Sequence, residues 1–149
     1  MYFVIKHFKE LSINELYEIV KSRFEVFVSE QKIVEQDFDD VDKESYHLFA
    51  IKDKRVIAYC RVITLSKEYN TPSIGRVLVL KEYRRKKLAF NIMTEAISFI
   101  KHNLKKEEVT LSAQEYIVDF YKSLGFVEAS NKYIEAGIPH IKMKLKLLI

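Results

Sequence analysis

Cysteine, proline, glycine and tryptophan are scarce in this chain, and each scarcity excludes something. The 149 residues include one Cys, two Pro, three Gly and no Trp. The single cysteine, Cys60, rules out an internal disulfide, and it lies in an apolar run, so we expect a buried thiol. So few glycines and prolines leave no flexible linker or disordered tail. We therefore expect one domain over residues 1–149.

Long apolar runs and strong charge are also lacking. No stretch approaches the ~20 apolar residues of a membrane-spanning helix, and basic residues interrupt the N-terminal segment, which argues against a signal peptide. We expect a soluble cytoplasmic protein with no membrane partner. The net charge of +4 fits an anionic small molecule or a nucleic acid without choosing between them. The histidines and the cysteine are not spaced along the chain as metal ligands are, so we expect no bound metal.

Apolar periodicity predicts an α/β fold with elements in the order β-α-β-β-β-α-β-α-β-β. The predicted strands lie near residues 2–8, 46–52, 55–65, 74–80, 109–113, 126–129 and 141–148. The runs 55–65 and 74–80 are apolar at nearly every position. That pattern is typical of strands covered on both faces.

Three helices are predicted between these strands. The first opens at Ser12, which forms a capping box with Glu15, and the others cover 85–104 and about 117–124, the last ended by Gly125. The first helix carries apolar residues at helical spacing, which predicts one buried face. That stripe is Ile13, Leu16, Tyr17, Val20, Phe24, Phe27 and Val28, with Arg23 and Glu30 at its border.

An acidic stretch over residues 35–44 follows the first helix. It resembles a calcium-binding loop superficially, but the glycine required at the sixth position is missing. We predict a solvated loop here, with attraction of a cationic amine as the alternative.

Four consecutive cations, Arg84 to Lys87, follow a buried strand and open the predicted second helix. A helix N-terminus disfavours cations, because its free amides already carry partial positive charge. The arrangement makes sense where an anion binds: the amides hold a pyrophosphate and the side chains reach outer phosphates. An ordinary solvated basic cluster is the alternative.

This stretch resembles motif A of the GNAT acetyltransferases, Arg/Gln-x-x-Gly-x-Gly/Ala, with Arg84 first and Ala89 last. Lys87 stands where the family has its middle glycine, which lets the backbone approach the phosphates. The resemblance implies that acetyl-CoA binds this turn and the strand before it. The implied contacts are Leu78, Val79, Arg84, Arg85, Lys86, Lys87, Leu88, Ala89 and Gln114.

A second segment, residues 119–126, resembles motif B of the same family, Phe-Tyr-x-x-x-Gly-Phe. The resemblance implies that Tyr121 protonates the CoA sulfur as it leaves. A tyrosine suits this role, because with a reference pKa of about 10 its hydroxyl is still protonated at neutral pH. The alternative is a core aromatic residue with no part in the chemistry.

Further pieces resemble the ElaA-like branch of the family over nearly the whole chain, among them Glu30-Gln31 and Gly137-Ile138-Pro139-His140. The resemblance implies a single GNAT-type domain with a mixed, mostly antiparallel sheet of six or seven strands and helices on both faces. It also implies transfer of acetyl from acetyl-CoA, by direct attack, to a primary amine of a small molecule or peptide. It does not supply the acceptor.

Several polar residues on apolar elements are candidates for the acceptor side. Those predicted to bind the acceptor are Arg23, Gln31, Arg61 and Arg76. A buried guanidinium must be paired, so Arg61 and Arg76 either form structural ion pairs, with Glu30 as one partner considered, or bind an acceptor carboxylate. Two residues compete as the base that deprotonates the amine, Glu30 and His140.

Three other readings stay open at this point. A regulator that binds acyl-CoA without catalysis is compatible with Lys87 at the glycine position. A nucleic-acid-binding module would use the Arg84 to Lys87 cluster, but the cluster is short and no known binding motif surrounds it. A GNAT-fold acyl-homoserine-lactone-type synthase would use a longer acyl donor. Nothing in the sequence decides for or against a homodimer.

Overall fold

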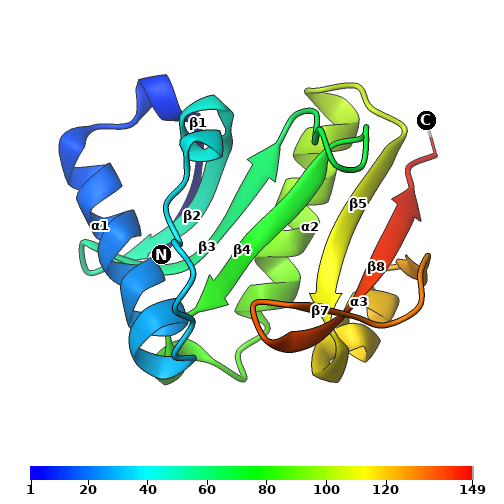
Figure 1. Ribbon diagram of the computed structural model, residues 1–149. Coiled ribbons are helices and arrows are strands. Elements are labelled where there is room, and N and C mark those ends of the chain that lie inside the picture. The colour runs from blue at the N-terminus through cyan, green and yellow to red at the C-terminus, as the bar shows by residue number, and fades with distance from the viewer. Residues whose placement is uncertain (149) are drawn as a thin grey trace.

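Eight strands form one sheet in the computed structural model, which describes residues 1–148. The strands are β1 (Tyr2–His7), β2 (Tyr46–Lys52), β3 (Arg55–Ile63), β4 (Ser73–Val79), β5 (Glu108–Gln114), β6 (Val127–Glu128), β7 (Tyr133–Glu135) and β8 (Ile138–Lys146). Their spatial order is β1-β2-β3-β4-β5-β8-β6, with β7 paired to β8 (Figure 1). All pairs except β4–β5 are antiparallel. This confirms the predicted mixed sheet; the strand not predicted, β7, has three residues, too few to leave a periodic pattern.

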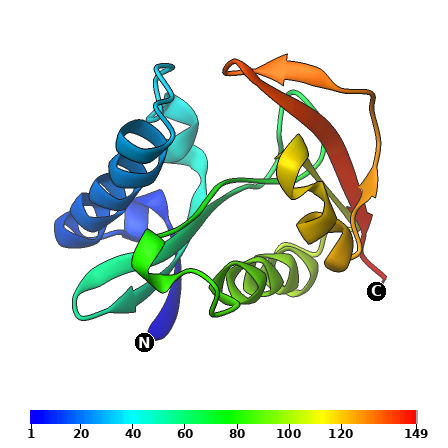
Figure 2. The same cartoon turned by 90° about the horizontal axis from the view of Figure 1, so that it is seen from below.

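Helices cover both faces of this sheet. They are α1 (Ile13–Arg23), α2 (Leu88–His102) and α3 (Val118–Ser123), and a π-helical segment, Phe24–Glu30, continues α1. Figure 2 shows α1 on one side of the sheet and α2 on the other. Among the described residues, no helix combines the length and the apolar character that crossing a bilayer demands.

The hydrophobic core lies between the sheet and its helices: α2 packs against β2, β3 and β4, α1 against β3, and α3 against β5. Its fully buried side chains include Phe49, Ile92, Ile100 and Met143. Cys60 on β3 lies among them, as predicted, and burial raises the pKa of its thiol. Gly125 also follows α3 as predicted, with a φ of 100°, and Phe126 is buried behind it.

The predicted buried face of α1 is wrong. Ile13, Tyr17, Val20 and Phe24 are exposed, and the helix turns a different face, with Ile19, Ser22 and Arg23, toward the sheet. One cause accounts for the rotation. Arg23 makes ion pairs beneath the helix that fix its inward face. Val26 and Phe27 of the π-helical segment continue this face three and four residues after Arg23, so Phe27 is the one residue of the predicted stripe that is buried.

The second predicted helix starts later than expected. Residues 85–87 form a turn, in which Arg85 and Lys87 have φ of 65° and 62°, and α2 begins only at Leu88. A left-handed residue ends any helical path, because an α-helix needs negative φ throughout. The cations therefore belong to the turn before the helix.

β4 carries the irregularity that opens the sheet. Arg76 has a φ of 51°, and the β3–β4 register shifts beside it, which marks a β-bulge. Pairing between β4 and its parallel neighbour β5 is limited to Ser73 with Thr110. The later part of β4 therefore leaves its backbone free on the β5 side, and Figure 1 shows the two strands diverging toward their C-terminal ends.

Candidate active site

Two cavities meet where β4 and β5 diverge. The first, here called the α2 cavity, has a volume of about 830 Å³ and lies between the end of β4, the turn before α2 and α3. The second, here called the arginine cavity, has a volume of about 450 Å³ and is lined by Arg61, Arg76 and residues of β4, β5 and β8. Five residues line both: Gln31, Val77, Tyr116, Ile117 and Tyr121.

The α2 cavity contains most of the predicted acetyl-CoA contacts. Seven of the nine line it: Leu78, Val79, Arg84, Arg85, Lys87, Leu88 and Ala89. The other two lie elsewhere. Gln114 lines the arginine cavity, and the ammonium of Lys86 lies over the ring of Tyr83, 5.8 Å from its centroid.

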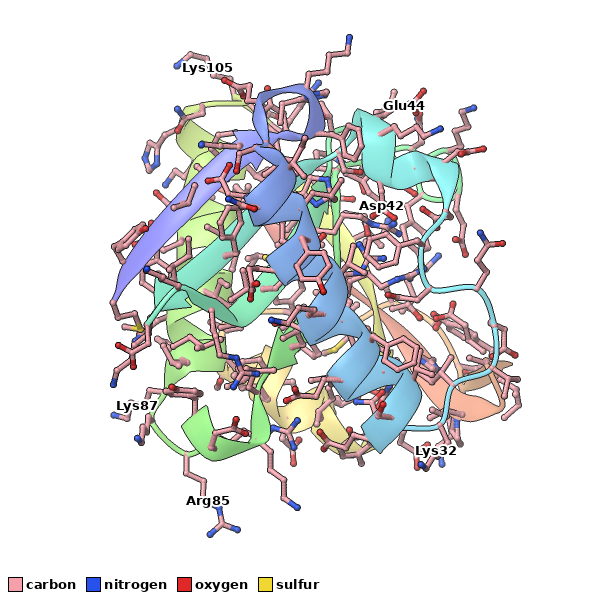
Figure 3. The ribbon with its side chains drawn as sticks, turned by 90° about the vertical axis from the view of Figure 1, so that its left-hand side faces the viewer. Lys32, Asp42, Glu44, Arg85, Lys87 and Lys105 are labelled. Carbon is pink, nitrogen blue, oxygen red and sulfur yellow. The ribbon has the colours of Figure 1, made fainter. Side chains whose placement is uncertain are left out.

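The start of α2 has free backbone donors beside several cations. Lys87, its N-cap residue, makes no capping hydrogen bond through its side chain, and the first backbone bond of the helix runs from the Asn91 amide to the Lys87 carbonyl (3.0 Å). The preceding amides therefore keep their donors free beside a cluster of cations, the arrangement that binds phosphate groups at helix starts. Figure 3 shows Arg85 and Lys87 projecting from this turn at the edge of the molecule.

Arg84 and Glu30, predicted for two different roles, contact each other. The Arg84 guanidinium donates two hydrogen bonds to the Glu30 carboxylate, at 2.6 and 2.8 Å, and a third from Nε to the Val79 carbonyl at 2.8 Å. Hydrogen bonding from Arg84 lowers the pKa of Glu30 below its usual value. A carboxylate held in this way is a weak proton acceptor, and Glu30 lines the α2 cavity but not the arginine cavity.

Tyr121 lies at the junction of the two cavities. α3 carries it inward until only 5% of the residue is exposed, with its ring edge-on to Phe120 and Phe126. Burial raises the pKa of its hydroxyl above the usual range, so the group keeps its proton at neutral pH. A tyrosine that lines both cavities and keeps its proton can serve as a proton donor at their boundary.

The acidic loop is not solvated as predicted, because it folds over three arginines. Arg23, Arg61 and Arg76 pair with Asp37, Asp39 and Asp42 in one group, here called the arginine–aspartate cluster. Asp42 is buried at its centre and lies on the inner side of the loop in Figure 3. The loop covers three arginines, and buried arginines must have anionic partners. The aspartates of the loop therefore form ion pairs with these arginines and are not simply hydrated.

Arg23 is the innermost member of this cluster. Its guanidinium donates to the Asp37 carboxylate (2.9 Å) and carbonyl (2.8 Å), to the Asp42 carboxylate (2.7 and 3.4 Å) and to the Tyr59 hydroxyl (3.3 Å). Since these bonds occupy its five donors and the residue is 0% exposed, Arg23 holds the loop against the sheet. It lines neither cavity, in contrast to the other acceptor candidates, Gln31, Arg61 and Arg76.

His140 lines the arginine cavity from the start of β8. Its Nδ1 lies 2.7 Å from the Ile138 carbonyl, so Nδ1 carries the proton and donates it to that oxygen. Nε2 is then the basic nitrogen, and it lies 3.5 Å from the Glu135 carboxylate. Of the two candidate bases, His140 is the one beside the arginine cavity.

Local sequence pattern does not reveal the partners that orient these groups. The stretch with Asp37, Asp39 and Asp42 has the pattern of a solvated loop, and nothing in the sequence marks Glu135 as a neighbour of His140. One signal was available: two arginines on strands that read as buried, and a third on a buried helix face, demand an equal number of nearby carboxylates. The acidic stretch 35–44 was the only dense source of them between the first helix and these strands.

Replacing Lys87 by glycine is expected to stabilise the protein by about 0.5–1 kcal/mol, because a left-handed φ costs a non-glycine residue about 1 kcal/mol or more. Urea unfolding measures the effect. Lys86→Gly is the matched control, since it removes the same charge at a residue without positive φ. If close approach of the backbone matters, Lys87→Gly also binds CoA more tightly than Lys86→Gly. A Lys87→Gly protein less stable than the wild type contradicts the prediction.

Comparison with known proteins agrees with this geometry. The family model described as an acetyltransferase (GNAT) domain matches residues 7–147. A UPF0039 protein of Schizosaccharomyces pombe is 36% identical over 147 residues, 97% of each chain. Protein ElaA of Escherichia coli is 33% identical over 144 residues, 95% of this chain and 94% of its own. The crystal structure of an acyl-CoA N-acyltransferase from Pseudomonas aeruginosa has a TM-score of 0.91 at 33% identity and covers 97% of this chain and 99% of its own.

Proposed function

The chain belongs to the GNAT acetyltransferase family and is an acyl-CoA N-acyltransferase, and on that premise we propose that it transfers acetyl from acetyl-CoA to a primary amine of a small molecule or peptide by direct attack. One observation carries the finer proposal. Tyr121 lines both cavities, so one residue with a proton to donate is shared by the cavity assigned to the thioester and the cavity assigned to the amine.

Binding of acetyl-CoA is assigned to the α2 cavity. The free amides at the start of α2 and the side chains of Arg85 and Lys87 receive the phosphates. The unpaired backbone edge of β4 beyond Ser73 receives the pantetheine arm, which carries amide groups that need partners. Arg84 stays bonded to the Val79 carbonyl and thereby fixes the end of this strand.

The acyl transfer then needs a base, an oxyanion site and an acid. His140 takes a proton from the ammonium acceptor, directly or through water, at Nε2. The free amine attacks the thioester carbonyl, and a backbone N–H near Val79 stabilises the oxyanion. The C–N bond forms and the C–S bond breaks, while Tyr121 gives its proton to the leaving sulfur. The attacking nitrogen then releases its second proton, which returns through water to the Tyr121 phenolate, and the proton held by His140 passes to solvent. The products are an N-acetylated acceptor and CoA.

Calorimetric titration with acetyl-CoA tests this assignment, with CoA and dephospho-CoA as the comparison ligands. We expect micromolar binding of acetyl-CoA that weakens when the 3′-phosphate is missing, because cations of the 84–87 turn are available to outer phosphates. Failure of all three ligands to bind contradicts the proposal. Tight binding without thiol release, over a broad panel of amines, favours the non-catalytic acyl-CoA-binding regulator instead.

A further inference from the structure

Two buried polar atoms on the arginine cavity have no hydrogen-bond partner within residues 1–148. One is a donor, Nε of Arg61, and the other is an acceptor, Oε1 of Gln31. An unsatisfied buried polar group is costly, and more so on a charged side chain. Because one orphaned atom donates and the other accepts, they match a ligand that is anionic at one end and carries N–H donors at the other.

The guanidinium of Arg61 keeps one whole edge for such a ligand. Its hydrogen bonds to the protein all come from Nη1, to Asp39 at 2.8 Å and to Asp42 at 3.0 Å. These contacts lie on one side of the planar group. The other side, formed by Nε and Nη2, has the two parallel donors that bind a carboxylate in bidentate fashion.

Gly75 keeps the space beside this edge open. It is the cross-strand partner of Arg61 on β4 and lines the same cavity. Its φ is not positive, and a Cβ built on it would meet no atom within 4 Å. Neither backbone conformation nor packing therefore requires glycine at this position. A side chain there would project into the arginine cavity next to Arg61.

The other end of the ligand lies toward Gln31. Gln31 and Val77 line both cavities, as does Tyr121, so an amine bonded to Gln31 lies near the proposed thioester. Val77 is two residues beyond Gly75, across the bulge at Arg76, and two residues of chain span at most about 7 Å. One small molecule can therefore place a carboxylate at Arg61 and an amine at this junction.

The charges on the cavity wall favour a zwitterion over either simple ion. The arginine–aspartate cluster has three cations and three anions and adds no net charge. Glu35, Glu68 and Glu135 also line the cavity, and they repel an acceptor that is only anionic. A plain amine satisfies Gln31 but leaves the Nε–Nη2 edge of Arg61 without an acceptor.

We propose that the acceptor is a small amino carboxylate, such as a free amino acid, whose carboxylate binds the Nε–Nη2 edge of Arg61 and whose amine lies at Gln31. This inference rests on the function proposed above and narrows its acceptor class. The reaction is unchanged: the amine nitrogen forms the new amide bond, CoA leaves as the thiol, and the carboxylate takes no part in bond making.

Thiol release from acetyl-CoA tests the proposal with a matched acceptor panel. The panel contains the proteinogenic amino acids, β-alanine and γ-aminobutyrate, each beside its carboxamide and its decarboxylated amine. We expect at least one free acid to be acetylated with a kcat/KM about 10- to 100-fold above that of its two analogues, because both lack the charged partner of Arg61. Equal rates with the carboxamides, or no reaction with any free acid, overturn the proposal.

Two variants localise the effect. Arg61→Lys removes the bidentate edge and keeps the charge. Arg55→Lys is its control, because Arg55 is a half-buried arginine on the same strand and lines neither cavity. Since Arg61→Lys also disturbs a buried ion pair, Gly75→Val is the second variant, and valine suits a strand. We expect Gly75→Val to raise the acceptor KM at least about tenfold with the acetyl-CoA Kd unchanged, because it fills the space beside Arg61.

An unchanged acceptor KM in Gly75→Val overturns the placement of the carboxylate. These results are separable from a failure of the proposed function. If acetyl-CoA binds and plain amines are acetylated while free acids are not, the enzyme assignment stands and the carboxylate proposal falls. If acetyl-CoA does not bind, the proposed function itself falls, and the carboxylate proposal falls with it.

Discussion

Replacing Tyr121 by phenylalanine is expected to lower kcat by about 10²- to 10³-fold, the range typical of a lost general acid. The leaving thiolate then departs without a proton from the protein. The affinity for acetyl-CoA is expected to stay the same, because the ring keeps its packing against Phe120 and Phe126. Steady-state kinetics of thiol release measures kcat, and calorimetry measures the affinity.

The Tyr121→Phe substitution should affect the chemistry without affecting the fold. Burial, with no hydrogen-bond contribution, raises the pKa of the Tyr121 hydroxyl. Its removal therefore breaks no hydrogen bond to a described residue, and we expect less than about 1 kcal/mol of destabilisation. Tyr17→Phe, on the exposed side of α1, is the control for a tyrosine outside both cavities. A Tyr121→Phe protein with the wild-type kcat removes the residue from the mechanism and leaves it a core aromatic.

Asp42→Asn is expected to lower the free energy of unfolding by about 3–5 kcal/mol, the usual effect of removing one partner from a buried ion pair. The Asp42 carboxylate accepts hydrogen bonds from both Arg23 and Arg61, so its neutralisation leaves two buried guanidinium groups short of an anion. For a chain of this length the melting temperature should fall by roughly 10 °C. Asp40→Asn, whose side chain is 97% exposed, is the control and should change stability little.

The destabilisation caused by Asp42→Asn should depend on pH, because the Asp42 carboxylate titrates. Burial alone raises the pKa of Asp42, but hydrogen bonds and positive charge from Arg23 and Arg61 outweigh it, so the folded-state pKa lies below the usual value. A lowered folded-state pKa means that the stabilisation is complete above the unfolded pKa, about 3.9, and is lost as pH falls through the folded value. The stability gap between wild type and Asp42→Asn should therefore narrow only in acid. A gap that is constant down to pH 2 contradicts this account.

The sequence predicted those parts of the fold that depend on local pattern. Apolar residues at strand or helix spacing predict the strands β1 to β5 and the helices α2 and α3. A glycine directly after an apolar helical segment predicts that Gly125 ends α3. The family resemblance supplied the sheet type. These features depend on residues near one another in the chain, so a pattern in one window is enough to find them.

What the sequence did not predict depends on distant partners. The face that α1 buries is set by Arg23, whose ligands Asp37 and Asp42 lie 14 and 19 residues later. The acidic stretch reads as solvated in isolation, because its partners Arg61 and Arg76 are on strands beyond it. The pairing of Glu30 with Arg84 spans 54 residues. No periodicity within a window reports such contacts.

The arginine–aspartate cluster also constrains how this enzyme can diverge. Arg61 and Arg76 form one wall of the arginine cavity and, at the same time, fasten the 37–42 loop to the sheet. A substitution there that alters acceptor choice also removes an internal ion pair, so most such variants lose stability before selection can act on their new preference. The opposite wall, with Ser112, Glu135 and Ala136, is outside the cluster. Relatives with other acceptors are therefore expected to differ first on that wall.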